Sequence, residues 1–131
     1  KALIIAKVPR RILSGQIEIV LAKKISDKTN WRKMLKNEIE DVNLEEKRDE
    51  LKQYLPDEVQ EYFLASNKET EIEFPVLEYP KKLKSLNLDK KPEYKGKLKG
   101  IKGQYLIFED DTVFNVRSNE GYKVNLEILV D

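Results

Sequence analysis

The sequence contains no cysteine and no histidine in its 131 residues. Without cysteine the chain can form neither a disulfide nor a thiolate metal site, and without histidine it lacks the other usual zinc ligand. The Ser/His and Cys/His nucleophile pairs are excluded for the same reason. We therefore expect no zinc in this chain, and any catalysis must use carboxylates, lysines, tyrosines or a hard cation such as Mg²⁺.

Long apolar runs are also missing, so no segment of the sequence is expected to cross a membrane. The residues are 40% apolar and 37% charged, a composition typical of a soluble globular chain with room for one ordinary domain or two very small ones. The chain opens with Lys1 and a strand-like run at residues 2–6, without the pattern of a signal peptide. We expect a cytoplasmic protein and interpret the sequence as a fragment of a longer one.

The net charge of +1 hides four blocks of alternating sign. Residues 1–36 carry ten basic and two acidic side chains, 37–79 four and fourteen, 80–108 nine and two, and 109–131 two and six. Basic clusters of this size attract phosphate backbones. The alternative is that acidic and basic blocks fold against each other and cancel.

Hydrophobic periodicity predicts an α/β front half. Residues 2–8 are expected to form a buried strand, and residues 11–25 a helix with its core face at Leu13, Ile17, Val20 and Leu21. A short helix over 31–36 would be capped by Asp27 or Asn30. The acidic residues 41–69 contain two further helices, with Val59, Tyr62 and Phe63 on the apolar side of the second. We expect this segment to be a solvated connector, or else a docking surface.

From residue 70 onward the period changes to two, which indicates β-structure. Strands are predicted at residues 70–76, 94–101, 104–109, 112–117 and 122–130, and together they suggest a small antiparallel β-barrel or twisted sheet over 70–131. The interleaved lysines and tyrosines could form a nucleic-acid groove with stacking surfaces. The alternative is a β-domain with core tyrosines and solubilising lysines. The candidate contacts are Lys84, Lys97, Lys99, Lys102 and Tyr105.

Glu18 is the only acidic residue among the first 26. On a helix it shares a face with Arg11, Ser14, Gly15 and Ala22, so a carboxylate would stand over small residues that a substrate or metal can approach. The alternative is a solvated glutamate that offsets the neighbouring basic charges.

Six motifs, in order along nearly the whole chain, resemble an uncharacterised prokaryotic family, domain of unknown function 2797. They are PRR at 9–11, SGQIE at 14–18, SDKTNWRKML at 26–35, PVLEYP at 75–80, KSLNLDK at 84–90 and GIKGQYLI at 100–107. The resemblance implies a cysteine-rich, zinc-binding segment and a strand pair similar to the start of GIY-YIG nucleases, both upstream of this chain. Residues 1–40 would then be the C-terminal part of a GIY-YIG-like α/β unit, and the fold class would be α+β.

The GIY-YIG likeness implies roles for particular residues. Glu18 would be the ligand of Mg²⁺, Asn30 would match an asparagine shortly downstream, and Arg10 or Arg11 would bind a phosphate. We also expect Lys28 and Arg32, which lie on either side of Asn30 in the sequence, to contact nucleic acid. The tyrosines and arginine that the nuclease family carries upstream are absent, so we expect this fragment to be inactive.

Two functions therefore remain open. The first is a nucleic-acid-binding fragment of a GIY-YIG-like, metal-dependent phosphodiesterase or its degenerate descendant, with DNA or RNA as partner. The second is a protein-interaction or scaffolding module in which the acidic block is the partner surface. Affinity for nucleic acid should fall steeply with salt, whereas an apolar docking surface should be insensitive to it.

Overall fold

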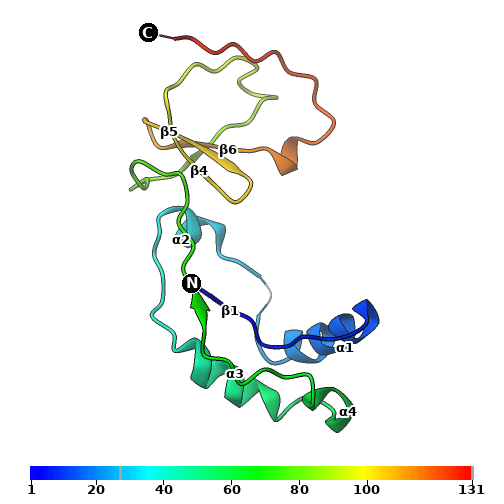
Figure 1. The fold of residues 1–131 in the computed structure, drawn as a ribbon. Helices are drawn as coiled ribbons and strands as arrows, with labels where there is room; N and C mark the ends of the chain where they lie inside the picture. Colours follow the sequence, from blue (N-terminus) through cyan, green and yellow to red (C-terminus); the bar gives the residue numbers. More distant parts are fainter. Residues whose placement is uncertain (27, 131) are drawn as a thin grey trace. The chain divides into compact units, whose positions relative to one another are not determined.

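The computed structural model describes residues 1–26 and 28–130, which fall into two compact units (Figure 1). Unit 1 comprises Lys1–Met34 and Glu38–Glu73, and unit 2 comprises Leu35–Asn37 with the described residues from Phe74 onward. Helices and open sheets are both present, which confirms the α+β class. None of the helices in these ranges is long and apolar enough to span a bilayer.

Unit 1 is built on a short antiparallel ribbon. Strand β1 (Ala2–Leu3) pairs with β2 (Glu69–Thr70), and a single bridge joins Ala6 to Phe63 further along. The predicted strand over residues 2–8 is thus regular only at its first residues. Its continuation stays close to the neighbouring chain because the Lys7 amide donates to the Tyr62 carbonyl.

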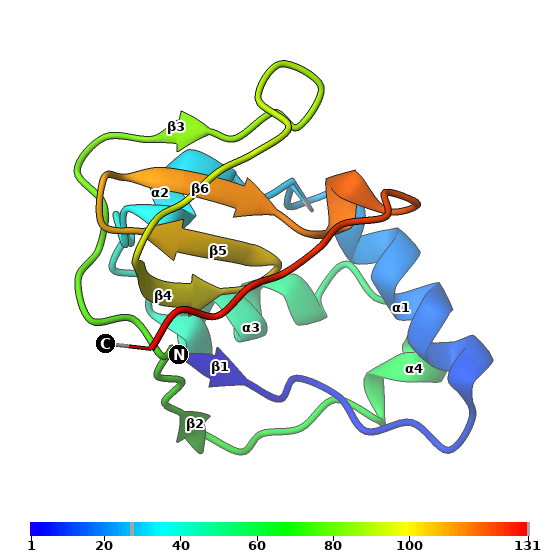
Figure 2. The same cartoon turned by 90° about the horizontal axis from the view of Figure 1, so that it is seen from above.

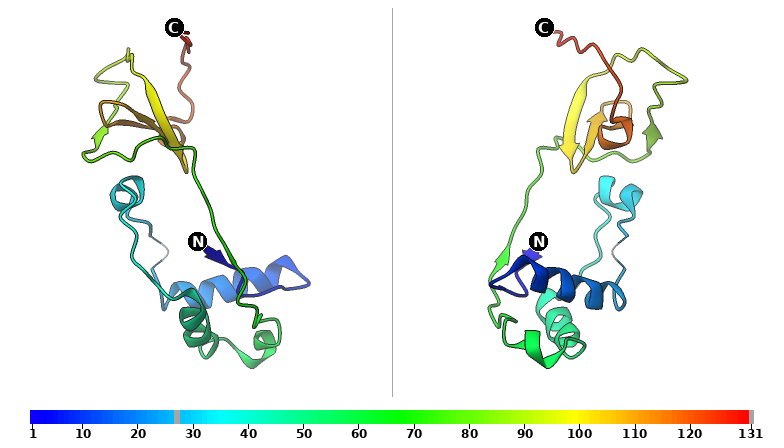
Figure 3. Two further views of the ribbon diagram at one scale, coloured as in Figure 1. Left: turned by 60° about the vertical axis from the view of Figure 1, so that its left-hand side comes forward. Right: turned by 90° about the vertical axis from the view of Figure 1, so that its right-hand side faces the viewer.

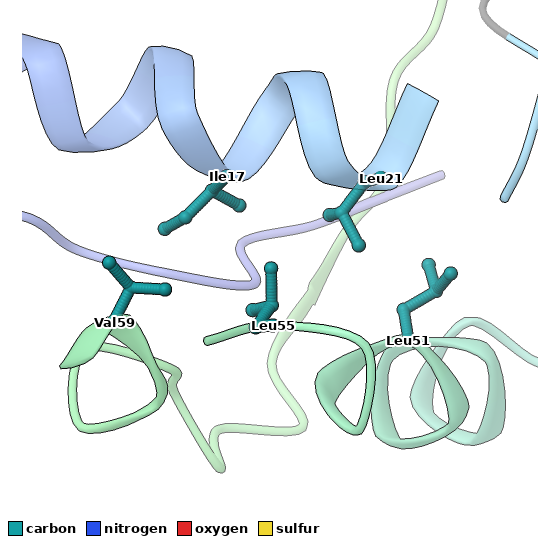
Figure 4. Close-up of a cluster of buried hydrophobic side chains, with 5 residues drawn as sticks. All are labelled: Ile17, Leu21, Leu51, Leu55 and Val59. Atoms are coloured by element: carbon teal, nitrogen blue, oxygen red, sulfur yellow. The ribbon is translucent and has the colours of Figure 1, made fainter. Parts of the chain in front are cut away.

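Helix α1 (Arg11–Ala22) supplies one side of the core of unit 1. Ile17 and Leu21 are buried and Leu13 and Val20 are partly buried, so the predicted core face is confirmed. Figure 4 shows Ile17 and Leu21 pointing toward Val59, Leu55 and Leu51 on the chain that follows. The helix ends at Ala22, before the predicted residue 25, because the Lys23 and Lys24 amides bond three residues back and tighten the last turn.

The acidic segment belongs to unit 1 and is not a separate connector between domains. Its helices are α3 (Leu44–Lys52) and α4 (Asp57–Gln60), which Figure 2 shows beside α1. Leu51 on α3, Val59 on α4 and Leu55 on the turn between them lie in the core that α1 covers (Figure 4). Tyr62 and Phe63 pack against the same core, as predicted. The thin apolar content of this segment predicts a solvated connector, but the burial of Leu51, Leu55 and Val59 against Ile17 and Leu21 holds the segment on α1.

Polar contacts complete the anchoring of α3. Asn43 caps the helix by accepting from the amides of Glu45 and Glu46. Arg48, which is 5% exposed, donates to the Ser66 carbonyl and to Asn67, and thereby ties α3 to the chain before β2. Removing the guanidinium would leave that carbonyl without its donor.

Unit 2 contains one open four-stranded sheet in the order β3-β6-β5-β4. Strands β4 (Leu98–Lys102), β5 (Tyr105–Phe108) and β6 (Thr112–Asn115) form an antiparallel meander, whereas β3 (Lys84–Ser85) runs parallel to β6. Turns at Gly103 and Asp111, both at positive φ, connect the meander. Ile107 and Val113 are buried on it.

The predicted closed barrel is therefore wrong. The sheet is open, and it is not purely antiparallel because β3 runs parallel to β6. Closure fails because two expected strands do not form: residues 70–76 contribute only Thr70, the last residue of β2, and a bridge between Val76 and Gly100. The 3₁₀ turn η1 (Arg117–Asn119) follows β6, and the described residues 122–130 carry no helix or strand (Figure 3). Alternation predicted a strand there, but a strand needs a pairing neighbour as well as a pattern.

Helix α2 (Trp31–Leu35) begins after Asn30. The Asn30 side chain accepts from the Lys33 amide, and its carbonyl accepts from the Met34 amide, which confirms Asn30 as the predicted cap. Asp27, the other cap candidate, lies outside the described residues.

Candidate functional site

An open, mainly apolar groove of about 390 Å³ lies along α1 in unit 1. Glu18 and Ser14 stand on its helical side, and Ile5, Ala6 and Val8 on the extended chain form the opposite wall. The groove continues past Ala22 to Ile25 and Ser26. Glu18 is exposed, so its carboxylate meets both solvent and this apolar floor.

The small residues expected beside Glu18 are partly found there. Ser14 and Ala22 line the groove as predicted from helical spacing. Gly15 has open space where a Cβ would be, so it is not required by close packing. A glycine inside a helix is about 1 kcal/mol less favourable than an alanine, and packing around Gly15 does not explain why glycine stands there.

The other residues predicted to act with Glu18 lie elsewhere. Arg10 occupies the position before α1, Arg11 begins the helix, and neither is among the residues that line the groove. Asn30 is engaged as the cap of α2 and is also absent from the groove lining. The structure therefore does not assemble Glu18, Asn30 and the two arginines around this groove.

Magnesium does not fit a site made by these residues alone. Within the ranges that the structure describes, no cluster of three or more acidic side chains could hold a metal ion. Glu18 would supply one carboxylate, and the Asn30 side-chain oxygen already accepts a backbone hydrogen bond. The Mg²⁺ assignment stays a prediction, and no chemical step is derived through it.

The beginning of α1 has the features of an anion site. Arg10 makes no side-chain cap, and no acidic residue occupies the first turn, so the helix N-terminus keeps its positive end uncompensated. Arg10 and Arg11 are both exposed, and neither makes an ion pair with any described residue. Two exposed arginines and a helix N-terminus therefore follow one another along the chain here, and each of these groups attracts phosphate.

Further cations of unit 1 follow the end of α1. Lys23, Lys24, Lys28 and Arg32 are exposed. Lys24 lies 4.5 Å from the Tyr54 ring centre. Arg32 lies 4.4 Å from the Trp31 ring centre. The predicted contacts Lys28 and Arg32 are both exposed, the latter while it stacks on Trp31, so both are accessible to a polyanion.

Two of the predicted phosphate contacts in unit 2, Lys99 and Lys102, are buried. Lys99 is 7% exposed and its ammonium donates to Asp111 at 2.7 Å. Lys102 is 5% exposed, and its ammonium donates to Asn37 at 3.2 Å. The same ammonium lies 4.9 Å from the Phe74 ring centre and 5.0 Å from the Tyr79 ring centre. Burial lowers the pKa of Lys102. These two lysines cannot serve as surface phosphate contacts without leaving the core.

Tyr105 is likewise a core residue and not a stacking surface. It is 8% exposed on β5, and its hydroxyl accepts from the Asn115 side chain. Spacing of tyrosines between lysines could not separate core from surface, because alternate residues of a strand face opposite sides and the pairing decides which side is covered.

The remaining predicted lysines of unit 2 are exposed. Lys84 lies on β3 at an edge of the sheet, and Lys97 precedes β4 with an exposed ion pair to Glu109 at 3.4 Å. Such exposed pairs contribute little to stability, so Lys97 loses little when it leaves Glu109 for another anion. The basic surface of unit 2 is completed by five more exposed lysines: Lys81, Lys82, Lys90, Lys91 and Lys95.

Sequence reasoning missed the wall of the groove opposite Glu18. The sequence predicts that Ile5, Ala6 and Val8 belong to a buried strand, whereas they are only partly buried and border an open groove. Their apolar run contained no signal for an uncovered edge, because a continuous apolar run is typical of strands covered on both sides.

Comparison with known proteins places the chain in a family but adds no activity. Residues 1–124 match the family model described as "Protein of unknown function (DUF2797)". Searches of the curated proteins and of the solved structures find no match. The resemblance to this family is confirmed, and the further likeness to GIY-YIG nucleases stays a prediction.

Proposed function

The chain belongs to the DUF2797 family, and we propose that it binds nucleic acid through the phosphate backbone. The observation that carries this proposal is the start of α1, where Arg10 and Arg11 flank an uncapped helix N-terminus without an acidic neighbour in the first turn. Arginine side chains and helix N-termini are among the groups that contact the phosphate oxygens of nucleic acids.

The distribution of the other cations supports the same function. Lys23 and Lys24 follow the opposite end of α1, about 18 Å from Arg11 for a helix of twelve residues, and the exposed Lys28 comes after them in the chain. Cations spread over this length can neutralise several phosphates of one strand and release their counterions. The exposed lysines of unit 2 supply a second, separate surface of the same sign.

The proposal assigns binding and not cleavage. Glu18 contributes one carboxylate to an apolar groove, and within the described residues no second acidic ligand joins it. Phosphodiester hydrolysis through Mg²⁺ remains the prediction that follows from the GIY-YIG likeness, and it needs groups beyond those gathered around Glu18.

Fluorescence anisotropy with labelled duplex DNA and single-stranded RNA tests the proposal. The double variant Arg10→Glu/Arg11→Glu should bind about tenfold more weakly or worse, and its salt dependence should correspond to about two fewer phosphate contacts. The matched control is Lys52→Glu/Lys68→Glu, which makes the same change in net charge at exposed positions of unit 1.

The control separates a site from a general charge effect. An equal loss in both double variants would show that only the net charge matters. No measurable binding of either nucleic acid at low salt would overturn the proposal.

A protein-interaction module is the second candidate, and the exposed acidic face of α3 and α4 favours it. The acidic side chains on this face are exposed while the apolar side of the helices packs against α1: Glu46, Asp49, Glu50, Asp57 and Glu58. A basic partner would fit this surface. For a protein-interaction module of this kind, Glu46→Lys/Glu50→Lys should abolish binding of polylysine, because it reverses two charges of the acidic surface. Binding of nucleic acid should stay unchanged or become stronger.

A further inference from the structure

Two cations that follow α1 in the chain lie over aromatic rings of unit 1. The Lys24 ammonium is 4.5 Å from the Tyr54 ring centre, and the Arg32 guanidinium is 4.4 Å from the Trp31 ring centre. Lys24 and Arg32 are both exposed, and neither forms an ion pair with a described residue. Each cation therefore keeps its charge available to an anion, although it already rests on a ring.

Packing of the neighbouring core residues leaves the Tyr54 ring at the surface. Leu51 and Leu55 point toward Leu21 on α1 (Figure 4). Tyr54, on the turn between these two leucines, is 40% exposed, and no described side chain hydrogen-bonds to its hydroxyl. An exposed ring with an ammonium beside it offers a stacking surface for a base together with a positive charge for its phosphate.

Arg32 offers a second stacking surface. Its guanidinium is planar, and bases stack on such planes as well as on aromatic rings. Trp31, half-buried at the start of α2, supports the guanidinium from one side. The Asn30 side chain caps that helix by accepting from the Lys33 amide, so the pair stands on a defined backbone. A base on the outer side of Arg32 would extend the stack.

We propose that the nucleic acid bound by unit 1 is single-stranded, and that its unpaired bases stack on Tyr54 and on Arg32. This inference rests on the proposed function, because it names the form of nucleic acid that the same cations bind. In a duplex the bases are paired and stacked on each other, so their faces cannot reach side chains on a protein surface. Stacking accepts every base, so we expect binding without sequence preference.

The phosphates of such a strand would meet the cations that neighbour the two stacking positions. Lys23 precedes Lys24 in the sequence, Lys28 lies between Lys24 and Arg32, and both Lys23 and Lys28 are exposed. A single strand releases fewer counterions per phosphate contact than duplex DNA does. Its affinity should therefore fall less steeply with salt than the affinity of a duplex for the same cations.

Trp31 is the only tryptophan of the chain, so its fluorescence reports directly on stacking at Arg32. Titration of the full chain with oligo(dT) and with oligo(U) should quench this fluorescence, and a duplex of the same length should quench it much less. The two oligonucleotides compare DNA with RNA, and quenching by either supports the proposal. Arg32→Lys keeps the positive charge but removes the plane, so it should lose most of the quenching.

Anisotropy titration measures the contribution of the other ring. Tyr54→Leu should weaken binding of single strands about fivefold or more and binding of a duplex much less. The matched control is Tyr122→Leu, because Tyr122 is 49% exposed and no described cation lies over its ring. This control should bind single strands as the wild type does. Circular dichroism checks that each variant is folded, and Arg32→Lys provides the affinity test if Tyr54→Leu is not.

The outcomes separate this inference from the proposed function on which it rests. Equal affinity for single strand and duplex would overturn the inference and leave backbone binding standing. A folded Tyr54→Leu variant that binds single strands as tightly as the wild type would also overturn it. Absence of binding to any of these nucleic acids at low salt would instead overturn the proposed function itself.

Discussion

The Lys99 ammonium on β4 donates to the Asp111 carboxylate at 2.7 Å, and this pair lies inside unit 2 with Lys99 only 7% exposed. Asp111 stands at positive φ in the turn before β6, and it also accepts from the Lys82 amide. One carboxylate therefore joins β4, the turn and the chain before β3. A lysine in a basic stretch of sequence is here a structural residue.

Breaking the pair from the acidic side should be the more damaging change. Asp111→Asn keeps the positive φ accessible but leaves the Lys99 charge buried without its counter-ion, and we expect a loss of about 3 kcal/mol in the free energy of unfolding. Lys99→Met should cost less than about 1 kcal/mol, because the aspartate that remains still reaches water. Urea denaturation of both variants checks the order, which an equal cost would contradict.

Stability should fall as the pH is lowered below the ordinary range of aspartate. The Lys99 hydrogen bond lowers the pKa of Asp111, and the Thr112 amide, followed by the Tyr94 hydroxyl, lowers the pKa of Asp110. Groups with a depressed pKa contribute stability above their unfolded pKa and lose it as the pH falls through the folded pKa. Denaturation at pH 7 and in acid should show this loss, and it should be smaller in Asp111→Asn. An identical acid loss in that variant would exclude Asp111 as a source.

Glu18→Gln should retain or slightly strengthen binding of nucleic acid. Glu18 is the only acidic side chain on α1, so its removal makes the surroundings of Arg11 more positive. Anisotropy titration of the variant beside the wild type measures the change. A Mg²⁺-dependent affinity that disappears in Glu18→Gln would instead show that this carboxylate holds the ion, as the nuclease likeness implies.

Gly100→Ala should destabilise unit 2 by about 1–3 kcal/mol. A Cβ at this position would meet the Val76 side chain at 2.9 Å and its Cα at 3.1 Å, where the two residues form their bridge. Val76→Ala in the same chain should recover only part of the loss, since the close Cα remains. Thermal denaturation of the single and double variants tests this, and full recovery would locate the clash in the Val76 methyls alone.

The sequence determined the features that depend on neighbours along the chain. Period and composition identified the core face of α1, the cap at Asn30, and the three strands of the meander in unit 2, because helices and tight β-turns are formed by residues close in sequence. The lone acidic charge of Glu18 and the arginines at the start of α1 could also be found by counting.

Only the tertiary structure decided what long-range pairing controls. The sequence predicts Lys99 and Lys102 as surface charges, but strand pairing buries both side chains. It also predicts a strand over residues 122–130, although none of the described strands pairs with them. The sequence predicts a connector around Leu51, Leu55 and Val59, whereas in the structure α1 covers these side chains. Burial depends on which segments meet, and segments distant along the chain meet through packing that no local pattern encodes.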